Sequence, residues 1–339
     1  MPPIYFYIPQ NDWPSVEISN ISQIEDIDTY LQSRSFQPHI THPVYCWIMQ
    51  TYLRLSANGF PCTLVGTLPH EGIVITYWDS IPIDFKPSVE LLIVGIIADG
   101  IYPHPYTQIR VVQNRKAALK FSASYYIPLW PHPGLIPRSS SRGDRFETIG
   151  YFGNAYNLAP ELKSESWRDR LQSLGLKWCL IEPDRWHDYS DIDTVLAARS
   201  FKKHDYLERP ATKLFNAWHA GVPAILGCES AFESERKSDL DYIEVSSPDE
   251  VLAALQRLRD DSDLRQAMIA NGRVRAEETS VESLTDRWRD FISQVAVPAY
   301  EAWGSASYVT QQSLFMQRFL AKKIDGLNHR LKKAFTSAR

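Results

Sequence analysis

Cysteine is scarce in this chain, and long apolar runs are missing from it. The 339 residues include four cysteines with no C-x-x-C pair, and each lies in an apolar segment where a free thiol behaves as a small hydrophobe. This pattern argues against a structural zinc site and favours a reducing compartment. No stretch reaches the roughly 18 apolar residues of a membrane span, and the N-terminus lacks the basic region and apolar core of a signal peptide. We therefore expect a cytoplasmic protein that is not integral to a membrane.

The sequence also lacks a strong excess of one charge. Its formal net charge is -4 and 44% of its residues are hydrophobic, which is typical of a soluble globular protein without an overall bias toward nucleic acid. It contains no Gly-x-x-x-x-Gly-Lys-Ser/Thr loop, which argues against a P-loop kinase. A chain of 339 residues is long enough for two domains, each with its own core.

Short apolar runs alternate with helical segments along most of the chain. Residues 72–77 and 91–97 are rich in β-branched side chains, as expected for parallel strands that are covered on both faces. Residues 130–144, rich in proline and serine, interrupt the alternation and are typical of a linker. The other expected strands are 4–8, 62–66, 108–112, 123–128, 147–152, 177–182, 192–198, 224–226 and 242–245, and the expected helices are 42–58, 160–174, 210–220, 248–260, 262–279 and 281–295.

The linker divides the chain into two α/β units of the nucleotide-binding kind. We predict a first domain at 1–140 and a second at 141–297. Pro298 interrupts a helical pattern, so we expect the chain to change direction there and to return toward the first domain in a third segment, 298–339.

The most informative segment is 208–227, which predicts a helix with a polar start followed by a short buried strand. Pro210 suits the first helical position, and Gly221 suits a left-handed helix end. Thr212 and Lys213 lie in the first turn, where unpaired backbone N–H groups and the helix dipole favour an anion. The alternative is that Lys213 is an ordinary solvated lysine, although the dipole disfavours a cation there by roughly 0.3–1 kcal/mol. This helix start is therefore a candidate phosphate site.

Residues 147–304 resemble the donor-binding domain of a GT-B glycosyltransferase. Three features carry the resemblance: the glycine-containing turn within 149–154, the helix start around Lys213, and the late helix that contains Pro298. The resemblance implies an α/β fold of two facing Rossmann-like domains, with the acceptor-side domain first, the donor domain second, and a C-terminal helix that crosses back to the first. It also implies transfer of a sugar from a UDP or GDP nucleotide sugar to an acceptor held between the domains.

The helix motif is similar to two versions of this family. Retaining GT-B enzymes have a glutamate, seven residues and a second glutamate before Ala-x-x-x-Gly; here Glu208 matches the first acid and Asn216 replaces the second. This version implies that Glu208 touches the donor sugar and that Asn216 bonds the ribose hydroxyls. The fucosyltransferase version, which inverts, implies that Lys213 binds the diphosphate, with Arg199 as its helper and Thr212 in place of an acid. The stereochemical outcome stays open.

Further donor contacts are expected in the glycine turn and in the loops that follow later strands. Gly153 and Asn154 allow the donor to approach the backbone, although Gly153 is equally a simple turn glycine. Arg199 is alternatively held in a salt bridge to Asp193 or Asp205. The predicted donor-binding residues are Gly153, Asn154, Arg199, Thr212, Lys213, Asn216, Glu229 and Ser230, and the predicted catalytic residues are Asp99, Lys213 and Glu208.

Asp99 is the expected general base if the reaction inverts. It follows the most apolar strand of the first domain, and the carboxyl ends of parallel strands are where open α/β sheets bind ligands. Asp79 and His104 are the other candidates. The alternative is that Asp99 is a turn residue ahead of Gly100.

We expect no essential metal and no cofactor beyond the nucleotide-sugar co-substrate. The triplets at 191–193 and 239–241 are Asp-x-Asp sequences, whose carboxylates would bind Mg²⁺ or Mn²⁺ on the diphosphate in a metal-dependent enzyme. We favour structural roles, because Asp193 lies early in a strand and Asp191 suits a turn cap.

The C-terminal segment is predicted to be a basic amphipathic helix. Residues 318–339 include seven Lys or Arg and one acidic residue, with Leu320, Ile324, Leu327 and Leu331 at helical spacing. The helix either lies on the first domain with a solvated face or makes a peripheral contact with the inner face of an anionic membrane that carries a lipid-linked acceptor.

The resemblance leaves the acceptor open between a glycan, a lipid-linked molecule and a small molecule, and no nucleic-acid partner is expected. Two alternatives to a transferase remain. One is a nucleotide-sugar epimerase of the same fold, and the other is a catalytically silent relative that binds a nucleotide sugar or a glycan.

Overall fold

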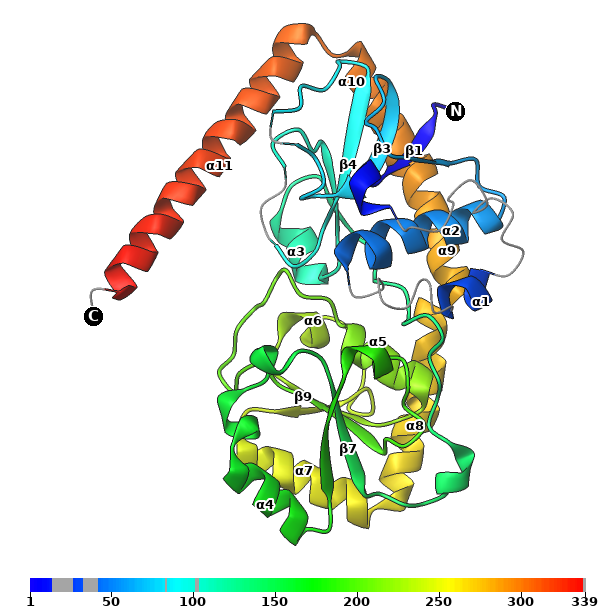
Figure 1. The fold of residues 1–339 in the computed structure, drawn as a ribbon, viewed down its shortest axis with the longest axis vertical. Coiled ribbons are helices and arrows are strands. Elements are labelled where there is room, and N and C mark those ends of the chain that lie inside the picture. Colours follow the sequence, from blue (N-terminus) through cyan, green and yellow to red (C-terminus); the bar gives the residue numbers. More distant parts are fainter. Residues whose placement is uncertain (14–26, 33–41, 83, 101–103, 338–339) are drawn as a thin grey trace.

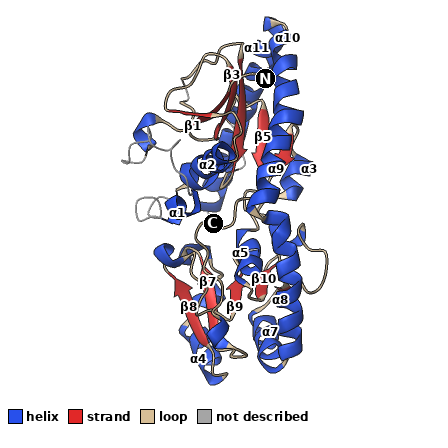
Figure 2. Ribbon diagram, turned by 90° about the vertical axis from the view of Figure 1, so that its right-hand side faces the viewer, coloured by secondary structure: helices blue, strands red, loops and turns tan. Residues whose placement is uncertain are grey.

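The computed structural model describes residues 1–13, 27–32, 42–82, 84–100 and 104–337. It consists of two bodies, each built around a parallel β-sheet with helices on its faces (Figure 1 and Figure 2). The predicted alternation of strands and helices is therefore confirmed in both halves of the chain.

The sheet of the first body has the strand order β2-β1-β3-β4-β5-β6, and all its pairings are parallel. β3 and β4 lie inside this sheet and are buried along their whole length, which explains their continuous apolar sequences. The strands are β1 (Ile4–Tyr7), β2 (Thr63–Val65), β3 (Gly72–Tyr77), β4 (Leu91–Ile97), β5 (Ile109–Val112) and β6 (Ser124–Tyr126).

The sheet of the second body has the order β11-β10-β9-β7-β8 and is also parallel. The neighbouring strands β7, β9 and β10 end at the same edge, so the loops that follow them meet there. The strands are β7 (Thr148–Phe152), β8 (Lys177–Ile181), β9 (Thr194–Ala197), β10 (Ala224–Gly227) and β11 (Ile243–Val245).

Most of the predicted helices are present, and three short ones, α1, α3 and α6, were not predicted. Ser164 divides the predicted helix 160–174, because its hydroxyl accepts the Trp167 N–H and caps α4. The α-helices are α1 (Ile27–Gln32), α2 (Gln50–Ala57), α3 (Arg115–Lys120), α4 (Glu165–Ser173), α5 (Thr212–Ala220), α6 (Ser230–Glu233), α7 (Pro248–Asp260), α8 (Ser262–Ala276), α9 (Val281–Phe291), α10 (Val297–Ser305) and α11 (Tyr308–Ser337), and π-helical segments cover Val44–Met49 and Ile292–Ala296.

The expected change of direction at Pro298 is wrong. The π-helical segment before Pro298 accommodates the missing proline N–H, and α9 and α10 follow one continuous path along the molecule (Figure 1). The chain turns instead at 306–307, between α10 and α11.

Each body has its own apolar core, and α9 contributes to the first core rather than the second. Leu284, Trp288 and Phe291 of α9 are buried with the apolar side chains of the first sheet. α10 and α11 add Trp303 and Phe315 to the same core. The C-terminal helices therefore cross back to the first body, as the resemblance implied. This packing favours assigning α9 to the first domain, earlier than the predicted limit at 297.

The two bodies touch along one side through loops at the ends of the sheets. The Asn114 side chain donates to the Ser230 hydroxyl at 2.9 Å. Lys116 Nζ lies 2.5 Å from Asp205 Oδ1. Glu235 is buried and accepts from both Arg115 Nε, at 2.8 Å, and the Tyr126 hydroxyl, at 2.6 Å. Most of these groups are polar, so the contact fixes the relative position of the bodies without a large apolar interface.

Asp193 ties the linker to the second sheet. Its side chain is 1% exposed, lies 2.6 Å from Arg142 Nη2 and 2.9 Å from Arg138, and accepts the N–H groups of Glu147 and Thr148. Asp241 has a similar role, since it accepts from Arg275 Nη1 at 2.7 Å. Each Asp-x-Asp triplet therefore has one buried carboxylate in an ion pair, Asp193 with two arginines and Asp241 with one, in the structural role that we favoured.

Replacing Asp193 with asparagine is expected to destabilise the protein by about 3 kcal/mol at pH 7, because it leaves two arginines without their shared buried counter-charge. Burial raises the pKa of Asp193, but Arg142, the two backbone donors and Arg138 outweigh it, and the pKa is lowered overall. Its contribution is therefore present above the unfolded pKa of about 3.9 and is lost as the pH falls through the lower folded pKa.

Urea unfolding of the wild type, Asp193→Asn and Asp191→Asn at pH 7 checks this expectation. Asp191 is the matched control because it belongs to the same triplet and its side chain is 51% exposed. Equal midpoints for the two variants would contradict the structural role of Asp193.

Candidate functional site

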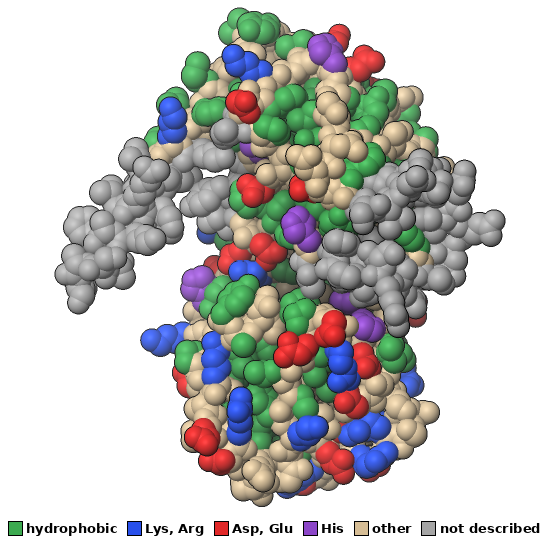
Figure 3. All heavy atoms as spheres, viewed as in Figure 1, with side chains coloured by type: hydrophobic (Ala, Val, Ile, Leu, Met, Phe, Trp, Pro, Cys, Tyr) green, Lys and Arg blue, Asp and Glu red, His purple; other side chains and the backbone are tan. Residues whose placement is uncertain are grey.

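A cavity of about 400 Å³ lies between the two bodies, at the edge where β7, β9 and β10 end. Its volume is within the usual range of small-molecule sites, roughly 300–1,000 Å³. Acidic, basic and histidine side chains gather at the waist between the bodies in Figure 3. We call this space the cleft cavity. Its lining residues are Asp99, His132, Phe152, Gly153, Asn154, Tyr156, Asn157, Trp186, Tyr189, Arg199, Arg209, Pro210, Thr212, Lys213 and Asn216.

The first turn of α5 forms one wall of the cleft cavity. The helix begins at Thr212, so Pro210 lies just before it rather than at its first position as predicted. No side chain caps this end, because the N-cap residue is Ala211. The other end matches the prediction, since Gly221 has φ = 67° and closes the helix in the left-handed conformation. The uncapped start leaves backbone N–H groups for a ligand.

Lys213 stands on this first turn in a half-buried position. Its Nζ lies 5.6 Å from the centre of the Tyr151 ring, a cation–π contact. Gly153 makes room for its stem, because a Cβ there would lie 3.3 Å from Lys213 Cε and 3.1 Å from the Tyr151 hydroxyl. Burial and the nearby Arg199 charge lower the pKa of Lys213 to about 8, and Glu229 acts in the opposite direction. Among the described residues, no carboxylate lies within 4.0 Å of the lysine nitrogen.

Two arginines face the same space. Arg199 follows β9, and its Nε lies 3.2 Å from the buried Glu229 carboxylate. Arg209 precedes α5 and pairs with the Asp99 carboxylate of the first body. The salt bridges from Arg199 to Asp193 or Asp205 that we considered are therefore wrong. Asp193 pairs with Arg138 and Arg142, and Asp205 pairs with Lys116.

Three buried donors at the cleft cavity have no hydrogen-bond partner within the described part of the chain. They are Thr212 Oγ1, Arg199 Nη1 and Arg209 Nε, although the last lies 3.8 Å from a Glu208 carboxylate oxygen. Buried donors are normally paired, because an unpaired one costs about 1–3 kcal/mol. Together with Lys213, they line one cavity, and an anion with several oxygens is the kind of ligand that accepts from such donors.

Asp99 reaches the cleft cavity from the end of β4. Its backbone has φ = 55°, a left-handed conformation that few residues except glycine, asparagine and aspartate adopt easily. Its N–H donates to the Glu208 carbonyl at 3.1 Å, so the backbones of the two bodies meet there. The alternative candidates for the base do not share this place. Asp79 is exposed, and buried His104 accepts the Tyr106 N–H at 3.4 Å. Neither lines the cavity.

Asn216 lies one turn after Lys213 on α5, and it is 5% exposed. Its Oδ1 accepts a hydrogen bond from the backbone N–H of His132 at 3.2 Å, and this bond fixes the orientation of the Asn216 amide. Burial lowers the pKa of His132 to about 4, so this imidazole is neutral at pH 7. Phe152 and Tyr189 stack beside Asn216 with ring centres 3.9 Å apart and add a flat aromatic surface. This end of the cavity is neutral, in contrast to the start of α5.

The structure brings seven of the ten predicted site residues to the cleft cavity. Glu208, Glu229 and Ser230 do not line it. Glu208 lies beside Arg209, and Glu229 forms an ion pair with Arg199. The Ser230 hydroxyl accepts from the Asn114 amide and donates to the Asp205 carbonyl. The residues at the cavity are Asp99, Gly153, Asn154, Arg199, Thr212, Lys213 and Asn216.

Arg209 and His132 were missed by the sequence analysis. Arg209 stands next to Glu208 in the loop that ends at the start of α5, so its position in the motif was the available signal. His132 lies in the proline-rich linker, and nothing in that segment indicated that it folds back onto α5. Within the described residues, no group of three His, Cys, Asp or Glu side chains is arranged to hold a metal ion.

Replacing Lys213 with methionine is expected to increase the free energy of unfolding by about 1–2 kcal/mol at pH 7, a value discounted for partial solvent access. The folded pKa of about 8 is below the unfolded value of 10.5, so the protonated lysine destabilises the fold below pH 8. The extra stability of the Lys213→Met variant should decrease as the pH rises from 8 to 10.5. In this range the folded wild type has already lost the lysine proton, and near pH 10.5 the unfolded chain loses it too.

Chemical denaturation of Lys213→Met and of the exposed control Lys202→Met at pH 7 and pH 10 measures this difference. A loss of stability in Lys213→Met at pH 7 would show that the lysine charge is compensated in the unliganded fold.

The comparisons with known proteins identify the fold. No protein-family model matches the sequence, and no curated protein matches it significantly. Solved structures of Anabaena HepE match with 9% sequence identity. The complex with UDP has a TM-score of 0.53 over 86% of this chain and 100% of that chain. The complex with UDP-glucose has a TM-score of 0.50 over 87% of this chain and 100% of that chain. The GT-B fold that the sequence motifs implied is thus confirmed: two parallel sheets face each other, and the C-terminal helices return to the first.

Proposed function

We propose that this protein is a glycosyltransferase that moves a sugar from a UDP-sugar to an acceptor hydroxyl in the cleft cavity. The observation that carries the proposal is the set of donors around the start of α5, where Lys213, Arg199 and Arg209 meet an uncapped helix end and unpaired buried N–H and O–H groups. A diphosphate is the ligand class that supplies several oxygens and a double negative charge. The choice of uridine rests on the neighbour HepE, which binds UDP and UDP-glucose in its solved structures.

In the proposed reaction, the bond between the anomeric carbon and the diphosphate oxygen breaks, and its electron pair stays on the leaving UDP. The acceptor oxygen forms the new bond to the same carbon and loses its proton. Lys213, Arg199 and Arg209 stabilise the growing charge on the leaving group, in a site that is already arranged before the substrate binds. Lys213 with a pKa of about 8 becomes fully protonated when the diphosphate arrives, because the new anion raises that pKa.

The remaining site residues follow from their positions. Glu229 holds the Arg199 guanidinium at the cavity. Gly153 leaves space for Tyr151 and the Lys213 stem, and Gly153 and Asn154 line the cavity where the donor would lie. The neutral end formed by Asn216 and the Phe152–Tyr189 stack suits the ribose and base. Asp99 is placed to accept the acceptor proton once the diphosphate draws Arg209 away from it.

UDP is expected to raise the melting temperature of the wild type, because it binds the folded state only. Lys213→Met should weaken UDP binding by about 2–4 kcal/mol, roughly 30- to 1,000-fold, whereas Lys202→Met should bind like the wild type. Isothermal calorimetry with UDP, GDP and uridine measures these affinities, and uridine should bind weakly because it lacks the diphosphate. Equal affinity of uridine and UDP would remove the basis for a diphosphate site.

The Asp99→Asn variant distinguishes a role of Asp99 as the base from a role in the turn alone, because asparagine also tolerates the left-handed backbone. We expect at least a hundredfold loss of kcat with a UDP-sugar and an acceptor, while UDP affinity stays the same or increases because Arg209 is freed. An unchanged kcat would exclude Asp99 as the base and would favour a retaining route. Turnover of the UDP-sugar to its epimer without an acceptor would assign an epimerase instead, and UDP binding without any turnover would assign a silent relative.

A further inference from the structure

In the described part of α11, apolar side chains lie on two faces, and one of these faces packs on the protein. Leu314, Phe315 and Phe319 face the first body, where Phe315 is 6% exposed and lies edge-on to Tyr106 at 5.0 Å. Gln311 is also buried there and donates to the Trp303 carbonyl at 2.8 Å. These contacts come from the start of the helix, and the ribbon of α11 then leads away from the body (Figure 1).

The second apolar face is open to solvent. We call it the outer stripe, and it consists of Val309, Met316, Leu320 and Ile324, whose exposed fractions are 76%, 66%, 54% and 56%. Single exposed apolar residues are ordinary, but four along one side of a helix are a patch that needs an explanation. In the sequence, Leu327, Leu331 and Phe335 follow at the same helical spacing.

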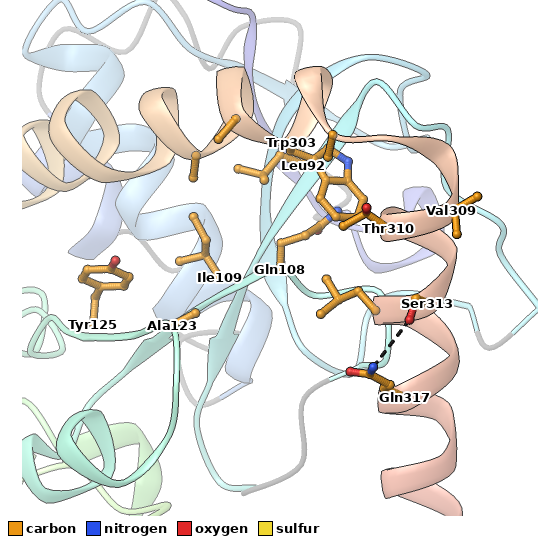
Figure 4. A pocket seen from close by; sticks show the side chains of 14 residues that line it. Leu92, Gln108, Ile109, Ala123, Tyr125, Trp303, Val309, Thr310, Ser313 and Gln317 are labelled. Carbon is orange, nitrogen blue, oxygen red and sulfur yellow. Dashed lines mark hydrogen bonds between the residues drawn. The ribbon is translucent and has the colours of Figure 1, made fainter.

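The outer stripe is continuous with an apolar cavity of about 700 Å³ between α10, α11 and the first sheet. Val309 and Leu314 border it from α11, and Leu92, Ile109 and Trp303 border it from β4, β5 and α10. Figure 4 shows Ile109 and Tyr125 on the sheet side and Ser313 and Gln317 on the side of α11. The exposed apolar surface therefore extends from the helix onto the body.

The charged residues of this segment are almost all positive. Residues 318–339 include seven Lys or Arg and a single acid, although the whole chain has a net charge of -4. Arg318 faces the body and donates to the Gln108 carbonyl at 3.4 Å, whereas Lys323 is exposed beside the stripe. An apolar stripe bordered by cations fits a surface that is itself apolar inside and anionic outside.

We propose that α11 docks on an anionic lipid bilayer, with the outer stripe in the acyl boundary and the lysines and arginines at the headgroups. The charge of the segment favours an anionic surface over a second copy of the chain, because two helices that each carry seven cations and a single acid repel one another. From Met316 onward the apolar residues follow at four, four, three, four and four residues, which differs from the three–four alternation of a heptad seam. Among the described helices, none is both long and apolar enough to cross a bilayer, so α11 lies in the interface.

The test measures co-flotation of the 339-residue chain with vesicles of phosphatidylcholine alone or of phosphatidylcholine with about 30% phosphatidylglycerol. We expect co-flotation with the anionic vesicles at low salt, weak binding to neutral ones, and release at 0.5 M NaCl. The double variant Leu320→Asp/Ile324→Asp should lose binding. Val274→Asp is the matched control, because Val274 is 70% exposed on α8 in the other body, and it should bind normally.

Each removed charge should weaken binding roughly fivefold, so Lys332→Gln/Lys333→Gln should lower affinity for anionic vesicles about 25-fold. An unchanged melting temperature in all variants shows that the fold is intact, and this control keeps the test independent of the proposed transferase activity. Failure to bind anionic vesicles at low salt overturns the proposal. A dimer that Leu320→Asp/Ile324→Asp converts to a monomer also overturns it, because the stripe then belongs to a second copy.

Discussion

Repulsion among three cations at the start of one helix is the constraint on which this structure depends. Lys213, Arg199 and Arg209 converge on the first turn of α5, where the helix dipole already disfavours positive charge. Glu229 and Asp99 offset part of this charge, and Asp99 does so from the other body. The unliganded fold therefore stores an unfavourable interaction that an anion relieves, which is the usual compromise between stability and function at binding sites.

The same charges link the site to the arrangement of the two bodies. Arg209 holds Asp99 across the cavity, next to the backbone contact from the Asp99 N–H to the Glu208 carbonyl. A ligand that competes for Arg209 changes an interdomain bond as well as a local one. The other contacts between the bodies, such as Asn114 to Ser230 and Arg115 to Glu235, lie outside the cavity. Arg209 is therefore the cavity residue whose ion pair also joins the two bodies.

The sequence was a good guide to the fold and a partial guide to the site. Strands such as β4 were predictable because a run like Leu91–Ile97 is apolar along its whole length, and Gly221 marked the end of α5 because only a left-handed residue closes a helix in this way. The path at Pro298 was not predictable, since a π-helical segment removes the effect of the proline. The Arg209–Asp99 pair was hidden because it depends on how the two bodies meet. The Arg199–Glu229 pair lies within the second body but joins the ends of two strands, and such contacts between distant residues leave no local pattern. The roles assigned to the cavity residues stay predictions.

The crossing of α9 also determines the order in which the chain can fold during synthesis. The core of the second body uses one continuous stretch, from Phe146 to Ala276, and is complete once that stretch has left the ribosome. The core of the first body needs Leu284, Trp288, Trp303 and Phe315, which are made last. The core of the first body therefore stays incomplete, with apolar side chains of its strands exposed, until α9, α10 and α11 have been synthesised. Translation from the N-terminus normally lets the first domain fold first. Here the order is reversed, because the second body has all its core residues before those that complete the first core have been made.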